Sequence, residues 1–82
     1  MDNEEIQEPV IYCGPDVPKL GVKKYAVYSG EMSSAMKYAM KEIPEIGKLI
    51  VKSSELEETR GLISVKGTAE YEYYKRIENA KY

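Results

Sequence analysis

Residues 32–52 read MSSAMKYAMKEIPEIGKLIVK and join a helix pattern to a strand pattern. In the first half, apolar residues recur at steps of three or four, which is the spacing of one face of an amphipathic helix. Ser33 is placed to cap the start of that helix, and Pro44 prevents it from continuing. Residues 48–52 form an apolar run flanked by lysines, which is typical of a central strand buried on both faces. We therefore expect a helix and a strand joined by a turn at residues 44–47.

Two further strand patterns come earlier in the chain. Residues 10–13 are a β-branched and aromatic run closed by a Gly-Pro pair, and residues 24–29 contain strand formers in alternation. Because a helix connects the strand at 24–29 to the strand at 48–52, we expect a right-handed crossover that sets these two strands parallel. The strand at 10–13 would then complete a small three-stranded mixed sheet.

Two helices are predicted after the sheet. Ser54 and Glu57 have the spacing of a capping box, and the helix that they open should run to about Lys66, where Gly67 stops it. Thr68 caps the next helix, whose acidic first turn and basic middle suit the helix dipole. The residues that we expect on the inner face of this last helix are Ala69, Tyr73, Ile77 and Ala80. The predicted fold class is therefore α+β, in the order β-β-α-β-α-α, with the sheet packed against helices.

Length and composition limit the kind of protein. The 82 residues are 43% hydrophobic and 32% charged, which suits a single folded domain. Four acidic residues among the first eight predict a flexible acidic arm at residues 1–8, followed by one α+β domain at 9–82. The chain has no apolar run of the roughly 18 residues that span a bilayer, an acidic start unlike a secretory signal, and a single cysteine. We therefore expect a cytoplasmic protein that does not enter a membrane.

The available side chains argue against catalysis. Histidine is absent, which removes the usual proton carrier near neutral pH and the commonest metal ligand. Cys13 has no histidine to activate it, so we expect a buried strand thiol rather than a nucleophile. The carboxylates of Glu55, Glu57 and Glu58 cluster at a predicted helix start, where capping explains them. We therefore predict a non-catalytic protein that uses no cofactor, metal or small-molecule substrate.

The tyrosines and one loop are the candidate contact surfaces. Eight tyrosines, with no Phe or Trp, give every aromatic ring a hydroxyl that needs water or a partner, which is typical of edges and interfaces. The irregular loop at 14–23 is apolar enough to interest another protein. The candidate partner-binding residues are Val17, Leu20, Val22, Tyr71 and Tyr74. We expect a protein partner or self-association.

Three short segments carry a resemblance to a known group of proteins. IYCGP at 11–15, YAVY at 25–28 and GTAEY at 67–71, with Tyr74, resemble small uncharacterised proteins encoded by phages and prophages of Gram-positive bacteria. The likeness spans residues 11–77 and includes no catalytic residue. It implies a phage-associated protein, encoded among virion assembly genes, in the host cytoplasm or in the virion.

Three functions are consistent with the sequence. The first is a phage or prophage protein-interaction module, as a minor virion or assembly component or a homo-oligomer. The second is an inhibitor of a host enzyme or defence factor, in which the acidic arm and the cluster at 55–58 mimic a nucleic-acid backbone. The third is a small nucleic-acid-binding regulator in which tyrosines stack on bases, although a net charge of −2 argues against it. The positive charge for this third function would come from Lys23, Lys24, Lys75, Arg76 and Lys81.

Overall fold

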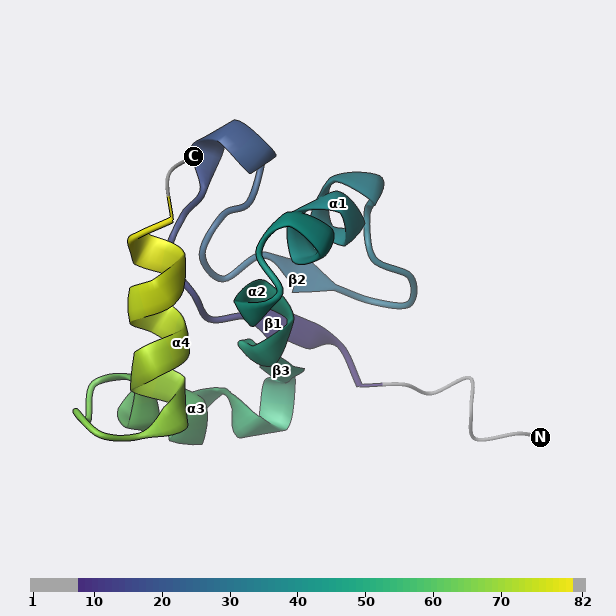
Figure 1. The fold of residues 1–82 in the computed structure, drawn as a ribbon. Helices are drawn as coiled ribbons and strands as arrows, with labels where there is room; N and C mark the ends of the chain where they lie inside the picture. Colours follow the sequence, from purple (N-terminus) through teal and green to yellow (C-terminus); the bar gives the residue numbers. More distant parts are fainter. Residues whose placement is uncertain (1–7, 81–82) are drawn as a thin grey trace.

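A computed structural model describes residues 8–80, and within them a small antiparallel sheet is packed with helices (Figure 1). The strands are β1 (Val10–Tyr12), β2 (Val27–Tyr28) and β3 (Ile50–Lys52). The α-helices are α1 (Ser34–Glu42), α2 (Glu45–Lys48), α3 (Leu56–Ile63) and α4 (Ala69–Glu78), and 3-10 turns form at Pro18–Leu20 and Ser53–Glu55. The predicted α+β class is confirmed. Residues 1–7 of the predicted acidic arm lie outside the described residues.

The first strand lies at the centre of the sheet, in the order β2-β1-β3, and runs antiparallel to both neighbours. Consequently β2 and β3 run in the same direction, as the predicted crossover requires, but they do not pair. The prediction of a mixed sheet was wrong. The loop after β1 reverses the chain, so that β2 pairs antiparallel with β1. The prediction of a central strand at 48–52 that is buried on both faces was wrong, because β3 is an edge strand. The fully buried residue of this run is Leu49, just before β3.

The second strand is shorter than predicted. The amide of Ala26 donates to the carbonyl oxygen of Lys23 at 3.2 Å, and this bond makes residues 23–26 a turn. Regular pairing with β1 therefore begins only at Val27. The loop before this turn folds onto the core through a two-residue bridge between Val17 and Val22.

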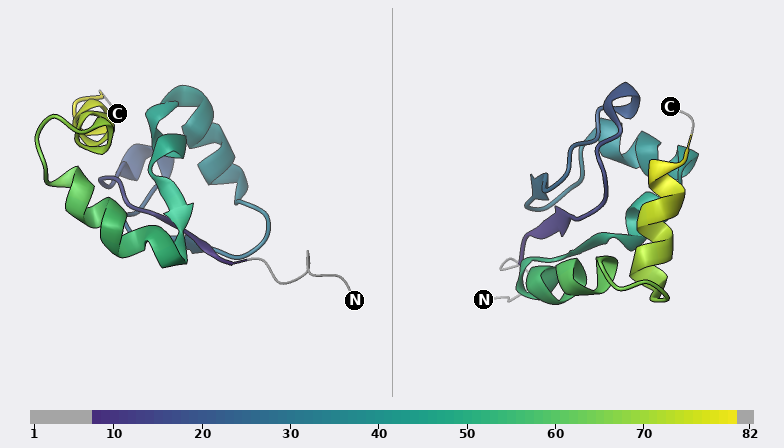
Figure 2. Two further views of the ribbon diagram at one scale, coloured as in Figure 1. Left: turned by 90° about the horizontal axis from the view of Figure 1, so that it is seen from below. Right: turned by 90° about the vertical axis from the view of Figure 1, so that its left-hand side faces the viewer.

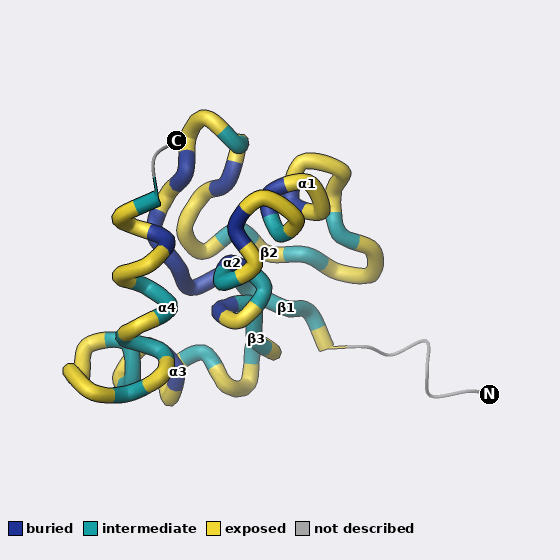
Figure 3. The backbone as a smooth tube through the Cα atoms, viewed as in Figure 1, coloured by how far each residue is buried: buried dark blue, intermediate teal, exposed yellow. Residues whose placement is uncertain are grey.

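The core lies between the sheet and the helices, and its buried positions are visible as dark segments in Figure 3. The Ser33 hydroxyl accepts a 3.1 Å hydrogen bond from the Met36 amide, so the predicted cap of α1 is confirmed. The predicted turn at 44–47 is instead the short helix α2, which buries Ile46 completely. The apolar residues of the core are Tyr12, Val17, Val22, Met36, Ala39, Ile43, Ile46, Leu49 and Ile77.

The last two helices differ from each other in how well their caps were predicted. The Thr68 hydroxyl accepts from the Tyr71 amide at 3.0 Å, so the cap of α4 is confirmed. Ser54 does not cap α3. Instead the Glu8 carboxylate accepts from the Ser54 amide at 2.6 Å and from the Ser53 hydroxyl at 3.0 Å, and a 3-10 turn precedes the helix. Glu8 therefore binds the Ser54 amide, which the Glu57 side chain would have bound in the predicted capping box.

The α3 helix also ends earlier than predicted, at Ile63 rather than Lys66. The Ser64 hydroxyl donates to the Gly61 carbonyl oxygen at 2.8 Å, and the Thr68 hydroxyl donates to the Leu62 carbonyl oxygen at 2.7 Å. These bonds satisfy carbonyl groups that the end of a helix leaves without partners. The chain then turns into α4, which packs against both α2 and α3 (Figure 2). Of the predicted inner face of α4, Ile77 is buried, Tyr73 and Ala80 are half-buried against the core, and Ala69 is exposed.

Candidate functional site

A β-bulge at the start of β2 positions the candidate site. The Tyr25 amide donates to the Tyr12 carbonyl oxygen at 2.7 Å, and the Tyr12 amide donates to the Ala26 carbonyl oxygen at 3.0 Å. Two residues of one strand thus lie opposite one residue of its neighbour. The φ angle of Tyr25 is 67°, so this is the bulge type whose first residue adopts the left-handed conformation.

Tyrosine is an unusual residue for this position. Among residues 8–80, Tyr25 is the one non-glycine residue with a positive φ angle. The first residue of such a bulge is normally glycine, because a Cβ atom in the left-handed conformation costs about 1–2 kcal/mol. Burial does not compensate this cost, because the Tyr25 side chain remains 46% exposed. Backbone strain of this kind is concentrated at functional sites, where the surrounding structure maintains it.

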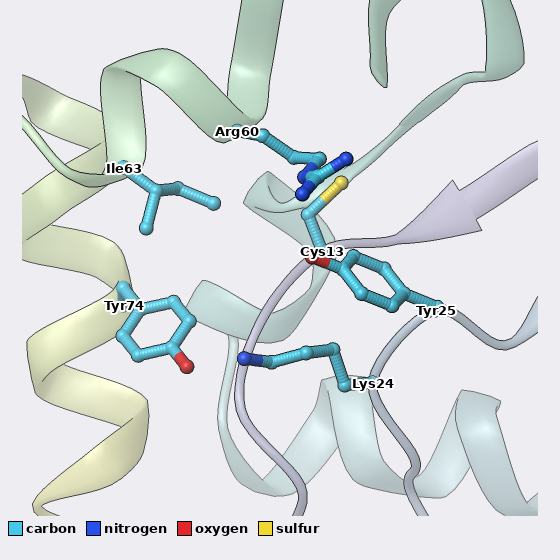
Figure 4. Close-up of a pocket in the computed structure, with 6 residues that line it drawn as sticks. All are labelled: Cys13, Lys24, Tyr25, Arg60, Ile63 and Tyr74. Atoms are coloured by element: carbon cyan, nitrogen blue, oxygen red, sulfur yellow. The ribbon is translucent and has the colours of Figure 1, made fainter. Parts of the chain in front are cut away.

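Tyr25 lines a pocket of about 230 Å³ that four segments of the chain form together (Figure 4). The segments are the residue after β1, the turn at 23–26, α3 and α4. In the view of Figure 4, the Lys24 and Arg60 side chains approach from opposite sides, and the two tyrosine rings close the other two sides. The lining residues are Cys13, Lys24, Tyr25, Arg60, Ile63 and Tyr74.

The cations and rings of the pocket contact one another. The Lys24 ammonium lies 5.2 Å from the centroid of the Tyr74 ring and 5.8 Å from that of Tyr25. The Arg60 guanidinium lies 5.6 Å from the centroid of the Tyr25 ring, on which two cations therefore converge. Cation–π contacts of this length contribute about 0.5–1 kcal/mol each at exposed sites. A hydrogen bond with the Tyr74 side chain raises the pKa of Lys24 above its ordinary value, so Lys24 is a cation at neutral pH.

The pocket is electrostatically positive although the chain is acidic. None of its lining residues within 8–80 is acidic. The nearest ion pair joins the Arg60 guanidinium to the Glu57 carboxylate at 3.4 Å, and both side chains are exposed. Asp16 also lies near Lys24, but its carboxylate accepts a 2.6 Å hydrogen bond from the Lys24 backbone amide and so supports the turn. Two cations thus face a space that has no carboxylate of its own.

Cys13 lines the pocket with a buried thiol. It is 2% exposed, and the predicted burial of its thiol is confirmed. Burial raises the pKa of Cys13, and the Arg60 charge partly opposes that increase. The thiol is therefore protonated at neutral pH and has little nucleophilic character.

The structure separates the five predicted partner-binding residues. Tyr74 lines the pocket, while Tyr71, three residues earlier on α4, is half-buried and does not line it, with the Lys75 ammonium 5.7 Å from its ring. Val17 and Val22 are buried core residues, and their backbones exchange hydrogen bonds of 2.9 and 3.1 Å that hold the loop closed. Leu20 is half-buried and packs against the core. The burial of both valines argues against direct contact through their side chains, and partner binding at the loop stays a prediction.

The sequence did not reveal most of the pocket. Lys24 and Tyr25 were assigned to a regular strand, and Arg60 had no feature that distinguished it from other charged helix residues. The available signal was a Lys-Lys-Tyr run between a turn-rich loop and a strand. That run indicates which residues are near the site but not that they bend into a bulge.

Searches for a membrane-spanning helix, a metal site and similar proteins add no further functional feature to the pocket. No helix in this range is long and apolar enough to cross a membrane. No cluster of three or more His, Cys, Asp or Glu side chains in the same range could hold a metal ion. Comparison of the chain with protein-family models, with curated proteins and with solved structures found no match.

Proposed function

We propose that the chain is a non-catalytic protein-interaction module whose pocket receives an anionic side chain of a partner protein. The observation that carries this proposal is the state of Tyr25. Its backbone is strained, its ring is exposed, and cations lie 5.8 and 5.6 Å from the ring centroid. Burial does not offset the backbone strain of Tyr25, which is consistent with a residue that contacts another molecule.

The size of the pocket favours a side chain over a free small molecule. Sites for drug-sized ligands and cofactors enclose about 300–1,000 Å³. A pocket of about 230 Å³ falls below that range. It suits a single side chain that projects from a larger partner.

The composition of the pocket favours an acidic protein partner. Tyrosine and arginine are enriched at protein interfaces and among the residues that dominate binding energy. A positive pocket on a chain of net charge −2 also orients an approaching anionic group toward one place on the surface. The resemblance of residues 11–77 to phage and prophage proteins supplies a setting for this partner, namely virion assembly in the host cytoplasm.

Nucleic acid is the second candidate ligand, and one observation favours it. Rings and cations in one pocket are also what single-stranded nucleic acids bind, through stacking and phosphate contacts. Such proteins usually add a positive groove that follows the backbone. Residues 8–80 contain a second ring-and-cation pair, in which the Lys75 ammonium lies 5.7 Å from the Tyr71 ring. The net charge of −2 nevertheless argues against a groove that follows a nucleic-acid backbone, so we favour a protein partner.

Inhibition of a host enzyme or defence factor by acidic mimicry stays a prediction, and it has less support than the protein-interaction module. Glu8 is bound to Ser53 and Ser54, and Glu57 pairs with Arg60 at 3.4 Å, so these two acids already have partners within the fold. The rest of the acidic arm lies outside the described residues.

Site-specific photo-crosslinking tests the proposed function. A benzoylphenylalanine would replace Tyr25 in the full chain, and a matched control would replace Tyr38, which is 55% exposed on α1 and does not line the pocket. In cells that naturally express the chain, we expect protein adducts at position 25 that Arg60→Glu removes and Lys41→Glu does not. Equal adducts at positions 25 and 38 would contradict the proposal. Adducts that nuclease degrades would favour the nucleic-acid function instead.

A further inference from the structure

Building on the proposed function, we infer that the pocket recognises a phosphate monoester on an aromatic ring, as in a phosphorylated tyrosine side chain of the partner. The inference rests on three features of the pocket: its charge, its apolar walls and the availability of its cations. Each feature narrows the class of anionic side chain that fits.

The charge of the pocket matches a dianion better than a carboxylate. Lys24 and Arg60 contribute two positive charges, and no lining residue within 8–80 is acidic. A carboxylate would neutralise one of these charges, whereas a phosphate monoester carries about −1.5 to −2 at pH 7 and has three acceptor oxygens. Because the two cations come from the 23–26 turn and from α3, a phosphate that enters the pocket faces positive charge from two sides. Charge-assisted hydrogen bonds to phosphate are about twice as strong as neutral ones.

The remaining walls of the pocket suit an aromatic ring. Ile63 and the Tyr74 ring form one side in Figure 4, and the buried Cys13 lines the pocket between Arg60 and Tyr25. One water occupies roughly 30 Å³ in the liquid. A pocket of about 230 Å³ therefore has room for an apolar group beside the oxyanion. A ring that packs against Tyr74 gains contact area and the favourable geometry of paired aromatic side chains.

Both cations are available to a ligand. The Arg60–Glu57 pair is solvent-exposed at both ends, and exposed pairs contribute only about 0–1 kcal/mol, so a phosphate can displace the Glu57 carboxylate. Lys24 is held beside the pocket by Tyr74, with its ammonium 5.2 Å from the ring centroid. The site is thus partly organised before the ligand arrives, which lowers the entropic cost of binding.

Titration of the full chain with small probes, followed by amide NMR spectra, tests the inference. The probes are phenyl phosphate, benzoate, phenol and inorganic phosphate. We expect phenyl phosphate to shift the amides of the pocket residues in a saturable way and to bind at least about tenfold more tightly than benzoate, which corresponds to about 1.4 kcal/mol. Phenol should not bind measurably, and inorganic phosphate should bind more weakly than phenyl phosphate.

Two variants locate the binding, and a third controls for general charge. Arg60→Gln and Lys24→Gln should each weaken phenyl phosphate binding about tenfold, because each removes one charged partner of the oxyanion. Lys41→Gln, which changes an exposed lysine in the last turn of α1, should leave it unchanged. The amide spectra of all three variants also show whether the fold is intact.

Each contrary result overturns either the inference about the phosphate ligand or the proposed function. Equal binding of phenol and phenyl phosphate would show an apolar pocket, and equal binding of inorganic and phenyl phosphate would show that no ring is recognised. Loss of binding in Lys41→Gln would show nonspecific charge attraction. If phenyl phosphate does not bind while crosslinks at position 25 persist, the proposed function as an interaction module is supported and the inference of a phosphate ligand is wrong. If phenyl phosphate binds and no crosslink forms, the pocket is a small-ligand site and the proposed function is wrong.

Discussion

The backbone amide of Tyr25 donates a 2.7 Å hydrogen bond to the carbonyl oxygen of Tyr12. Tyr12 is fully buried, and its own hydroxyl donates to the Pro15 carbonyl oxygen at 2.8 Å. One core residue therefore fixes both the chain reversal after β1 and the bulge that presents Tyr25 to solvent. The shape of the pocket depends on this hydrogen bond between the core residue Tyr12 and the surface residue Tyr25. Substitutions at Tyr25 and beside Tyr12 should therefore have distinct effects.

Glycine should be better tolerated than alanine at position 25. Elsewhere alanine is the more stabilising of the two by about 0.4–1 kcal/mol, because glycine loses more backbone entropy on folding. At a φ of 67° the Cβ atom of alanine costs about 1–2 kcal/mol, so Tyr25→Gly should be more stable than Tyr25→Ala by about 0.5–1 kcal/mol. Denaturant unfolding measures the difference. At the helical control position 38 the order should be the ordinary one, with alanine favoured by about 1 kcal/mol. Alanine favoured at both positions would show that the bulge is absent.

Adding one methyl group should have opposite effects at Gly14 and Gly61. A Cβ atom at Gly14 would lie 2.6 Å from the Cζ atom of the buried Tyr12 ring, so Gly14→Ala should destabilise the fold by about 1–3 kcal/mol. Gly61 lies within α3 with no atom in the path of its Cβ, so Gly61→Ala should stabilise the fold by about 0.5–1 kcal/mol. Thermal unfolding of the two variants provides the comparison. A harmless alanine at position 14 would mean that the Tyr12 ring does not pack over that residue.

The Glu8 carboxylate should stabilise the fold only when it is ionised. Hydrogen bonds from Ser54 and Ser53 lower its pKa below the ordinary value of 4.5. A pKa that is depressed in the folded state adds stability above the unfolded pKa, and that stability is lost as the pH falls through the folded pKa. Glu8→Gln should therefore lower the melting temperature slightly at about pH 7, and the difference should shrink as the pH falls below about 4.5. Circular dichroism across this range measures the effect, with Glu72→Gln on α4 as the control. A difference that does not depend on pH would rule out the carboxylate as the cause.

Removal of one hydroxyl should lower the pKa of Lys24. The Tyr74 side chain raises that pKa by a hydrogen bond, and Tyr74→Phe keeps the ring while removing the bond. We expect the Lys24 pKa to return toward 10.5, measured by NMR titration of its side chain. A raised lysine pKa adds stability below the unfolded pKa, and that stability is lost as the pH rises through the folded pKa. The variant should therefore be slightly less stable than the wild type at neutral pH, and this difference should vanish as the pH rises through the folded pKa of Lys24. Tyr71→Phe should leave Lys24 unchanged. The same pKa in all three proteins would mean that the two side chains do not meet.

Local signals in the sequence predicted the parts of the fold that local interactions determine. Ser33 and Thr68 cap their helices as expected, because the hydroxyl and the amide that it accepts from are only three residues apart. The predicted capping box at Ser54 and Glu57 does not form, because Glu8, 46 positions earlier in the chain, accepts from the Ser54 amide that Glu57 would have bound. Sequence spacing around position 54 contains no information about that carboxylate.

The candidate site was harder to predict, because it exists only after distant elements have packed. Tyr25 adopts a left-handed backbone because Tyr12 binds it, whereas its neighbours alone are typical of a strand. Arg60 and Tyr74 line one pocket with Lys24 only because α3 packs against α4. Tyr74 was predicted as a contact residue from its hydroxyl and its helix position, and the structure adds the cation that it contacts.

Competition between the small ligand and the partner tests the central claim most directly. The chain with benzoylphenylalanine at position 25 would be irradiated in lysate of its native cells, with and without phenyl phosphate at a concentration that saturates the pocket. We predict that phenyl phosphate suppresses the protein adduct at position 25, while phenol at the same concentration leaves it unchanged. An adduct at position 25 that forms equally well beside a saturated pocket would contradict the claim that the partner enters between Lys24 and Arg60.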